Sequence, residues 1–229
     1  MDEPSHPHHR PLARQALRTP RAAAVAGILF AVLFTISVGL MRLAIPENIA
    51  RADAYTWLQT NAGTVQFALM LMPFAGIAFL WFIGVIRDRL GAHEDQFLST
   101  VFFGSGLLFL AMVFSSAAVA GGMVSAYALD RETLETSGVF TFGRFVIYTI
   151  TNVYAIRMAG VFMLSLGTIW MRTRVMPRFL VFLTYILAIV LLVVINMTAW
   201  VMLVFPLWVF VISVFILFVS VRGDGEHAK

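Results

Sequence analysis

The chain carries little charge for its length. Only 12% of its 229 residues are Asp, Glu, Lys or Arg, whereas 60% are hydrophobic and the mean hydropathy is +0.89. A soluble domain carries about 25% charged residues, so a chain with half that share lacks the side chains to cover a water-facing surface. Disorder is excluded as well, because 21 Phe and 12 Met give the chain more apolar surface than a disordered segment has. The composition predicts a polytopic membrane protein.

Cysteine is absent from the sequence. Its absence excludes disulfides, thiolate catalysis and Cys-ligated metal or iron–sulfur sites. All twelve acidic residues and all five histidines fall outside the apolar stretches. That placement disfavours proton relays, bis-histidine haem, zinc hydrolysis and carboxylate-coupled transport, which need such groups at membrane depth. The sequence predicts no cofactor and no metal site.

Six apolar stretches are long enough to cross a hydrocarbon core of about 30 Å, which takes about 20 helical residues. They lie near residues 22–45, 64–86, 98–122, 146–171, 179–197 and 200–221. The last two form one apolar run that would measure about 64 Å as a single helix, so we expect it to fold back at Asn196. A β-barrel is disfavoured because its strands alternate polar and apolar residues.

We therefore expect an all-α integral membrane protein, a bundle of six transmembrane helices. Its transmembrane domain spans residues 22–221, between a disordered basic tail at 1–21 and a short tail at 222–229. We also expect a short interfacial helix within residues 46–63.

Basic residues are distributed unevenly between the predicted loops. Two, Arg51 and Arg131, lie in the first and third loops, whereas eleven lie in the tails and the even-numbered loops. These eleven are Arg10, Arg14, Arg18, Arg21, Arg87, Arg89, Arg172, Arg174, Arg178, Arg222 and Lys229. The positive-inside rule then places both termini in the cytoplasm. The Arg- and Ala-rich composition favours a bacterial plasma (inner) membrane, and the basic loops indicate contact with anionic lipid rather than nucleic acid.

Two sequence features predict how the helices pack. Pro73 and Pro206 lie well inside the second and sixth spans and should kink them. The third span ends in overlapping pairs of small residues that favour close helix packing or dimerisation. The pairs are Ser116 with Ala120, Ala117 with Gly121, and Ala118 with Gly122.

The most polar stretch within the hydrophobic body begins the fourth predicted span. Arg157 lies about 10 Å below the outer end of that span, where a charged side chain costs about 2.5–3.5 kcal/mol. Arg144, Tyr148 and Thr151 follow helical spacings of four and three and share one face. Arg157 lies about 140° away around an unbroken helix. The two arginines therefore serve different neighbours, or the helix breaks near Gly143.

Polar groups within the spans concentrate in the outer half of the predicted bundle. We predict an outward-facing polar cleft, lined by the fourth span, that binds an anionic or amphipathic ligand such as a lipid headgroup or a small carboxylate. Its candidate residues are Arg157, Tyr154, Arg144, Tyr148, Thr151, Asn152, Gln66 and Asn196. Arg42 lies at a similar depth.

A purely structural role for these arginines is the alternative. They would extend toward the interface, bond to backbone carbonyls, or pair with acidic residues of the outer loops. Those acidic residues are Asp53, Asp130, Glu132 and Glu135.

Three classes of function compete. The polar cluster and the prolines favour a small carrier or a lipid- or ligand-binding protein, whose partners would be membrane lipid and a small anionic or amphipathic molecule. Small-residue packing and short loops favour a structural or accessory subunit that forms a homo-oligomer or binds another membrane subunit. An intramembrane enzyme is disfavoured, because the spans offer no identifiable nucleophile, base or metal site.

Overall fold

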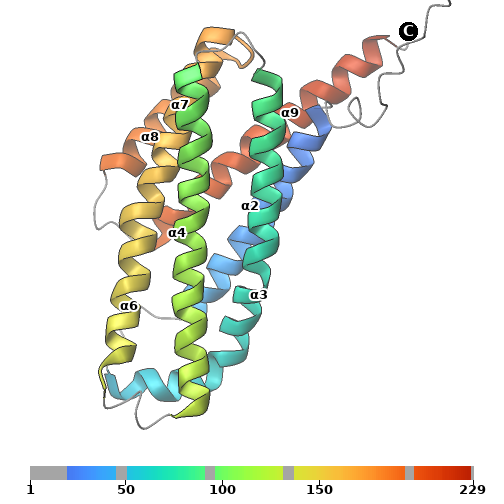
Figure 1. Ribbon diagram of the computed structural model, residues 1–229. Coiled ribbons are helices and arrows are strands. Elements are labelled where there is room, and N and C mark those ends of the chain that lie inside the picture. The colour runs from blue at the N-terminus through green and yellow to red at the C-terminus, as the bar shows by residue number, and fades with distance from the viewer. Residues whose placement is uncertain (1–19, 45–50, 91–95, 131–136, 194–198, 228–229) are drawn as a thin grey trace, which may run out of the picture.

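The computed structural model describes residues 20–44, 51–90, 96–130, 137–193 and 199–227, and throughout these ranges the regular structure is helical (Figure 1). The elements are α2 (Pro20–Ala44), α3 (Arg51–Leu90), α4 (Gln96–Leu129), α6 (Val139–Thr149), the π-helical segment η1 (Ile150–Ala155), α7 (Ile156–Thr173), α8 (Arg178–Val193), the 3₁₀ segment η2 (Ala199–Leu203) and α9 (Val204–His227). The predicted all-α fold is confirmed. Of the two predicted tails, residues 1–19, 228 and 229 lie outside the described residues, and α9 continues to His227.

Five of the helical rods are long and apolar enough to cross a membrane. They cover Arg21–Arg42, Thr60–Asp88, Gln96–Leu129, Val139–Thr173 and Trp200–Arg222. The fifth predicted span corresponds to α8, a shorter apolar helix of 16 residues, about 24 Å long. The predicted turn at Asn196 lies outside the described residues. The chain is a multi-pass membrane protein with six apolar helical rods.

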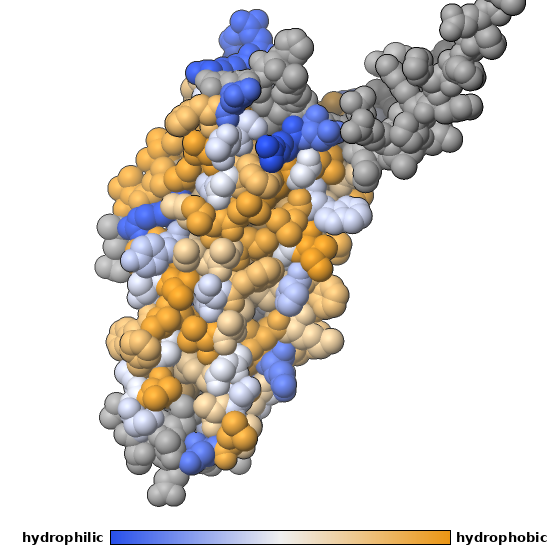
Figure 2. Space-filling view, viewed as in Figure 1, coloured by the Kyte–Doolittle hydropathy of each residue, from blue (hydrophilic) through white to orange (hydrophobic). Residues whose placement is uncertain are grey.

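Successive rods run in opposite directions, so the chain crosses the bundle back and forth (Figure 1). α2 packs against both α3 and α9, α7 packs against both α4 and α8, and α4 also contacts α3. Because of this alternation, Arg21, Arg87, Arg172 and Arg222 all gather at one end of the bundle, which we call the basic end. Hydrophobic residues cover most of the visible flank between the two ends (Figure 2).

Phe79 of α3 lies at the centre of the bundle, where rings from five helices meet. Its ring centroid is 4.6 Å from that of Phe30 on α2, 5.5 Å from Phe109 on α4, 5.5 Å from Phe162 on α7 and 5.7 Å from Phe205 on α9. All five side chains are at most 2% exposed. Tilted and edge-to-face ring contacts are favourable, and in lipid such packing drives helix association where the hydrophobic effect does not. The rings fill the bundle centre at this level.

Helix α8 is joined to its neighbours by two polar contacts that the sequence analysis did not predict. The Trp208 indole of α9 donates to the buried Thr184 hydroxyl of α8 at 2.9 Å. The Tyr185 hydroxyl of α8 donates to Thr168 of α7 at 3.0 Å. α7 and α8 also approach closely, since a Cβ at Gly160 would lie 3.1 Å from the Ala188 carbonyl oxygen. These contacts attach the shortest of the six rods to the bundle.

The small residues near the end of α4 are only partly used in packing. Ser116 and Ala120 are buried, which confirms packing for that pair. Ala118 and Gly122 lie on the exposed face of the same helix. One pair therefore packs within the bundle and another is presented to the surroundings.

The two prolines occupy different positions in their helices. Pro73 lies inside α3, as predicted. Pro206 is the third residue of α9 and follows η2, so it lies in a first helical turn, where the missing N–H has no intrahelical partner to lose. Pro206 lies within the span Trp200–Arg222, and the turn before it is 3₁₀ rather than α-helical. The predicted interfacial helix is continuous with the span, since α3 begins at Arg51 and its first turns cross one end of the bundle (Figure 1).

The rods differ in length, and this places part of the chain beyond the end of α2. α2 has 25 residues, about 38 Å, whereas the rod from Val139 to Thr173 has 35 residues, about 52 Å. Arg42, near the end of α2, contacts Asn152 of that rod. α6 and the last turns of α4 therefore continue past α2, away from the basic end (Figure 1). We call this part, residues 117–129 and 139–149, the extension.

Truncating the central ring should destabilise the bundle. We expect Phe79→Ala to lower the free energy of unfolding by about 3–5 kcal/mol, the usual effect of removing a buried aromatic side chain. Phe74→Ala on the same helix is the matched control, because Phe74 is 55% exposed. Thermal unfolding in mild detergent measures both variants, and equal loss of stability would contradict a central role for Phe79.

Candidate functional site

The fourth rod changes its helical geometry within the predicted site. Between Ile150 and Ala155 it is π-helical, and the backbone N–H of Ile156 donates to the Thr151 carbonyl, five residues back. The rod is continuous through Gly143, so the alternative of a helix break there was wrong. π-turns are rare and occur frequently at functional sites. This one separates Arg144 from Arg157, and the two arginines serve different neighbours.

Thr151 faces the interior of the bundle. It is 7% exposed, and its hydroxyl lies 2.8 Å from the hydroxyl of Ser116, which is 5% exposed. Each hydroxyl thus has a partner across the contact between η1 and α4. Thr151, a predicted ligand-binding residue, is engaged in helix packing.

Asn152 connects the same rod to α2. The guanidinium of Arg42 donates from Nη2 to Asn152 Oδ1 at 3.3 Å. The Asn152 amide donates to the Tyr148 carbonyl oxygen at 3.1 Å. This pairing joins residues 110 positions apart and was not predicted, although Arg42 was expected at a similar depth.

Arg157 lies one turn further into the bundle than Asn152. Its side chain is partly buried, and Nη1 donates to the Val153 carbonyl oxygen at 2.6 Å. Tyr154, three residues away, is 55% exposed. Helical side chains tilt toward the N-terminus of their helix, so the guanidinium extends toward the extension. Within the described residues, no carboxylate pairs with Arg157. Of the structural roles considered for the arginines, bonding to a backbone carbonyl is the one seen here, through a single hydrogen bond.

The remaining predicted site residues lie apart from Arg157. The Arg144 guanidinium carbon is 6.0 Å from the ring centroid of Phe140 on α6. Tyr148 and Gln66 are exposed, and Asn196 lies outside the described residues. The described candidates thus form separate groups: Thr151 contacts Ser116 of α4, Asn152 contacts Arg42 of α2, and Arg157 lies beside Tyr154.

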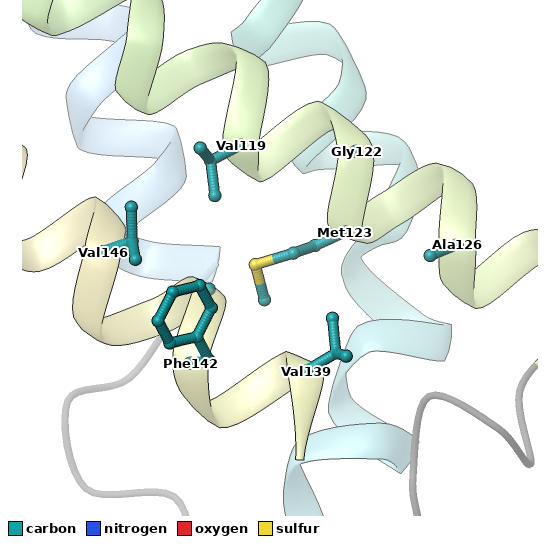
Figure 3. Close-up of a pocket in the computed structure, with 8 residues that line it drawn as sticks. Val119, Gly122, Met123, Ala126, Val139, Phe142 and Val146 are labelled. Carbon is teal, nitrogen blue, oxygen red and sulfur yellow. The ribbon is translucent and has the colours of Figure 1, made fainter. Parts of the chain in front are cut away.

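A pocket of about 220 Å³ opens between α4 and α6, within the extension (Figure 3). Every residue that lines it is apolar: Val119, Gly122, Met123, Ala126, Val139, Phe142, Gly143 and Val146. The fourth rod contributes one wall through Val139, Phe142, Gly143 and Val146. None of the predicted site residues lines this pocket, so its chemistry is hydrophobic rather than polar.

Among the described residues, no three His, Cys, Asp or Glu side chains group so that they could hold a metal ion. No protein-family model, curated protein or solved structure matches the chain.

The Ser116–Thr151 contact should contribute modestly to stability. We expect a double-mutant cycle of Ser116→Ala and Thr151→Val to give a coupling of about 0.6 kcal/mol, typical of interhelical hydrogen bonds in membranes. Unfolding of the four proteins in detergent measures it. The cycle of Ser116→Ala with Thr168→Val is the control, since Thr168 bonds to Tyr185 instead, and equal coupling in both cycles would contradict the prediction.

Proposed function

We propose that this protein binds an anionic lipid headgroup through Arg157 and Tyr154, without catalysing a reaction. The observation that carries the proposal is the state of Arg157: a partly buried guanidinium with one backbone acceptor, beside an exposed tyrosine. A guanidinium has five N–H donors, so several stay available for a ligand. Phosphate and carboxylate groups accept such donors in pairs.

The depth of Arg157 favours a headgroup as the ligand. Arg157 lies five residues beyond Asn152, about 7 Å along the rod, and Asn152 is level with Arg42 near the end of α2. A guanidinium at this depth, directed back toward the end of α2, reaches the zone where lipid phosphates lie. The energetic cost of a charge in the hydrocarbon, about 2.5–3.5 kcal/mol, is offset when an anion binds there.

Binding is better supported than transport. A carrier needs a path for its substrate through the bundle, but the rings around Phe79 fill the centre. Asn152 and Thr151, which would line a polar path, are paired with Arg42 and Ser116. A site on the flank of the fourth rod needs no such path.

An accessory subunit of a membrane complex is the second candidate. The observation that favours it is exposed apolar surface on the extension, where Leu129 is 88% and Phe145 66% exposed. Both lie past the end of α2. A stoichiometric membrane protein that co-purifies from native membranes in mild detergent would support this candidate.

We also propose that the basic end faces the cytoplasm of a bacterium and that both termini lie there. The gathering of Arg21, Arg87, Arg172 and Arg222 at one end supports this orientation. A green fluorescent protein fused after Lys229 should therefore fluoresce, and alkaline phosphatase fused at the same position should be inactive. The reverse pair of results would overturn the orientation.

Anionic lipid should stabilise the wild-type protein through Arg157. We expect phosphatidylglycerol to raise the unfolding midpoint in detergent more than phosphatidylcholine with the same chains. Arg157→Ala should weaken this effect by roughly tenfold to a hundredfold in lipid concentration, the range expected for the loss of charged hydrogen bonds. Arg157→Lys should retain part of the effect, and Tyr154→Phe should reduce it.

Arg222→Ala is the matched control for this experiment. Arg222 stacks on Phe218 at 5.1 Å, at the basic end of α9. If Arg222→Ala weakens the effect as much as Arg157→Ala, the effect is general charge attraction. That result, or an equal response to both lipids, would overturn the proposal.

A further inference from the structure

The turn between α7 and α8 contains a backbone conformation that favours glycine, yet an arginine occupies it. Arg174 follows the last residue of α7 with φ 55° and ψ 25°, in the left-handed region. Its backbone N–H donates to the Trp170 carbonyl oxygen at 2.9 Å and closes the helix. Within the part of the chain that the structure describes, no other residue except Gly138 has a positive φ. Glycine is the usual residue at such a helix end, because a Cβ is unfavourable there.

The side chain of Arg174 has no partner in the fold. Neither Arg174 nor Arg178 makes a side-chain hydrogen bond, ion pair or ring contact with the described residues. The backbone N–H that closes α7 would be supplied equally well by a glycine. Residues held in an unfavourable backbone conformation cluster at functional sites, where the side chain is required. The guanidinium of Arg174 is thus placed for a ligand outside the fold.

Positive charge is concentrated in this turn. Arg172, Arg174 and Arg178 lie within seven residues and are all exposed, and residues 171–179 include no acidic side chain. Each guanidinium presents five N–H donors, and phosphate accepts such donors in pairs. The turn lies at the basic end of the bundle (Figure 1). Its charge therefore favours an anionic group at that membrane surface.

Apolar side chains are interleaved with these arginines. Met171, Val175 and Phe179 follow spacings of four and are 53%, 70% and 74% exposed. Met176, between them, is buried and anchors the turn on the bundle. At a lipid interface, apolar side chains of this kind enter the acyl region while guanidinium groups reach the phosphates. A soluble polyanion would leave the three apolar side chains in water, so charge and exposed apolar surface together indicate a phospholipid.

We propose that Arg174, together with Arg178, binds the phosphate of an anionic phospholipid in the leaflet at the basic end. The lipid neutralises the charge and covers the exposed apolar side chains in one contact. The site is distinct from that of Arg157, which lies 15 residues before Arg172, about 22 Å along the rod. General attraction of basic loops to anionic lipid needs no arginine in a left-handed conformation, so Arg174 is the residue that gives this site its specificity.

Quenching of a single fluorophore in the turn tests this proposal. The chain has no cysteine, so Val175→Cys, at an exposed position, carries one label in the full chain. The labelled protein is placed in phosphatidylcholine vesicles that contain phosphatidylglycerol or phosphatidylcholine with a nitroxide quencher near the top of one acyl chain. We expect stronger quenching by the phosphatidylglycerol. Equal quenching by both lipids would overturn the proposal, and so would loss of the preference in inorganic phosphate but not in chloride of the same ionic strength.

Substitutions of Arg174 separate a binding role from a structural one. We expect Arg174→Gly to reduce the preference for phosphatidylglycerol roughly fivefold, the effect of one charge at an anionic surface. The same change should raise the unfolding midpoint in detergent without added lipid by about 2–4 °C, because glycine suits the left-handed conformation. A lower midpoint would show that Arg174 supports the fold, and it would overturn the proposal. Arg174→Asn also removes the charge and tolerates this conformation, so it tests binding if Arg174→Gly does not fold, and Arg174→Lys should keep part of the preference.

Arg222→Ala serves as the control for charge at the same end of the bundle. The Arg222 guanidinium stacks on Phe218 at 5.1 Å, away from the turn in sequence and on a different helix. Its removal should leave the lipid preference at position 175 unchanged. An equal loss in Arg222→Ala and Arg174→Gly would show general charge attraction and overturn the proposal. The label reports lipid at the turn alone, so neither result depends on Arg157.

Discussion

Ring packing around Phe79 is the interaction on which the rest of the structure depends. Rings from α2, α3, α4, α7 and α9 meet there with centroid distances of 4.6 to 5.7 Å between Phe79 and its four neighbours. In a membrane the gain comes from close van der Waals contact, since lipid tails are as apolar as the rings. Contact at this centre joins five helices and fills the middle of the bundle with side chains.

Several polar side chains around that centre form hydrogen-bonded pairs that join different helices. Thr151 and Ser116 bond to each other, Arg42 bonds to Asn152, and Trp208 bonds to Thr184. Each pair satisfies groups that would be costly in hydrocarbon. Arg157 differs, because its described partner is one backbone carbonyl of its own helix. Arg157 also lies directly after the π-helical segment η1, on the flank of the fourth rod.

Features of the site that depend on residues close together in the sequence could be predicted, whereas contacts between residues far apart in the sequence could not. Arg157 and Tyr154 were placed on one side from spacing alone, which is a local property. The pairing of Arg42 with Asn152 could not be predicted, because it joins α2 to η1 across 110 residues. The apolar pocket was missed for the same reason, because its lining residues lie on two separate helices, α4 and α6. The π-turn lacked a signal as well, since its residues fit an ordinary α-helix.

Hydropathy and helix periodicity, which depend on each residue and its near neighbours, were sufficient to determine the all-α class, the six apolar rods and the gathering of arginines at one end. Lipid leaves the backbone few choices, so composition and length alone determine that much. Tertiary structure decided which rods pack together, which polar groups bond to each other, that α4 and α6 extend past α2, and that an apolar pocket opens between them. Those outcomes depend on how side chains from distant segments fill a shared space. The low charge of the chain does not determine this packing.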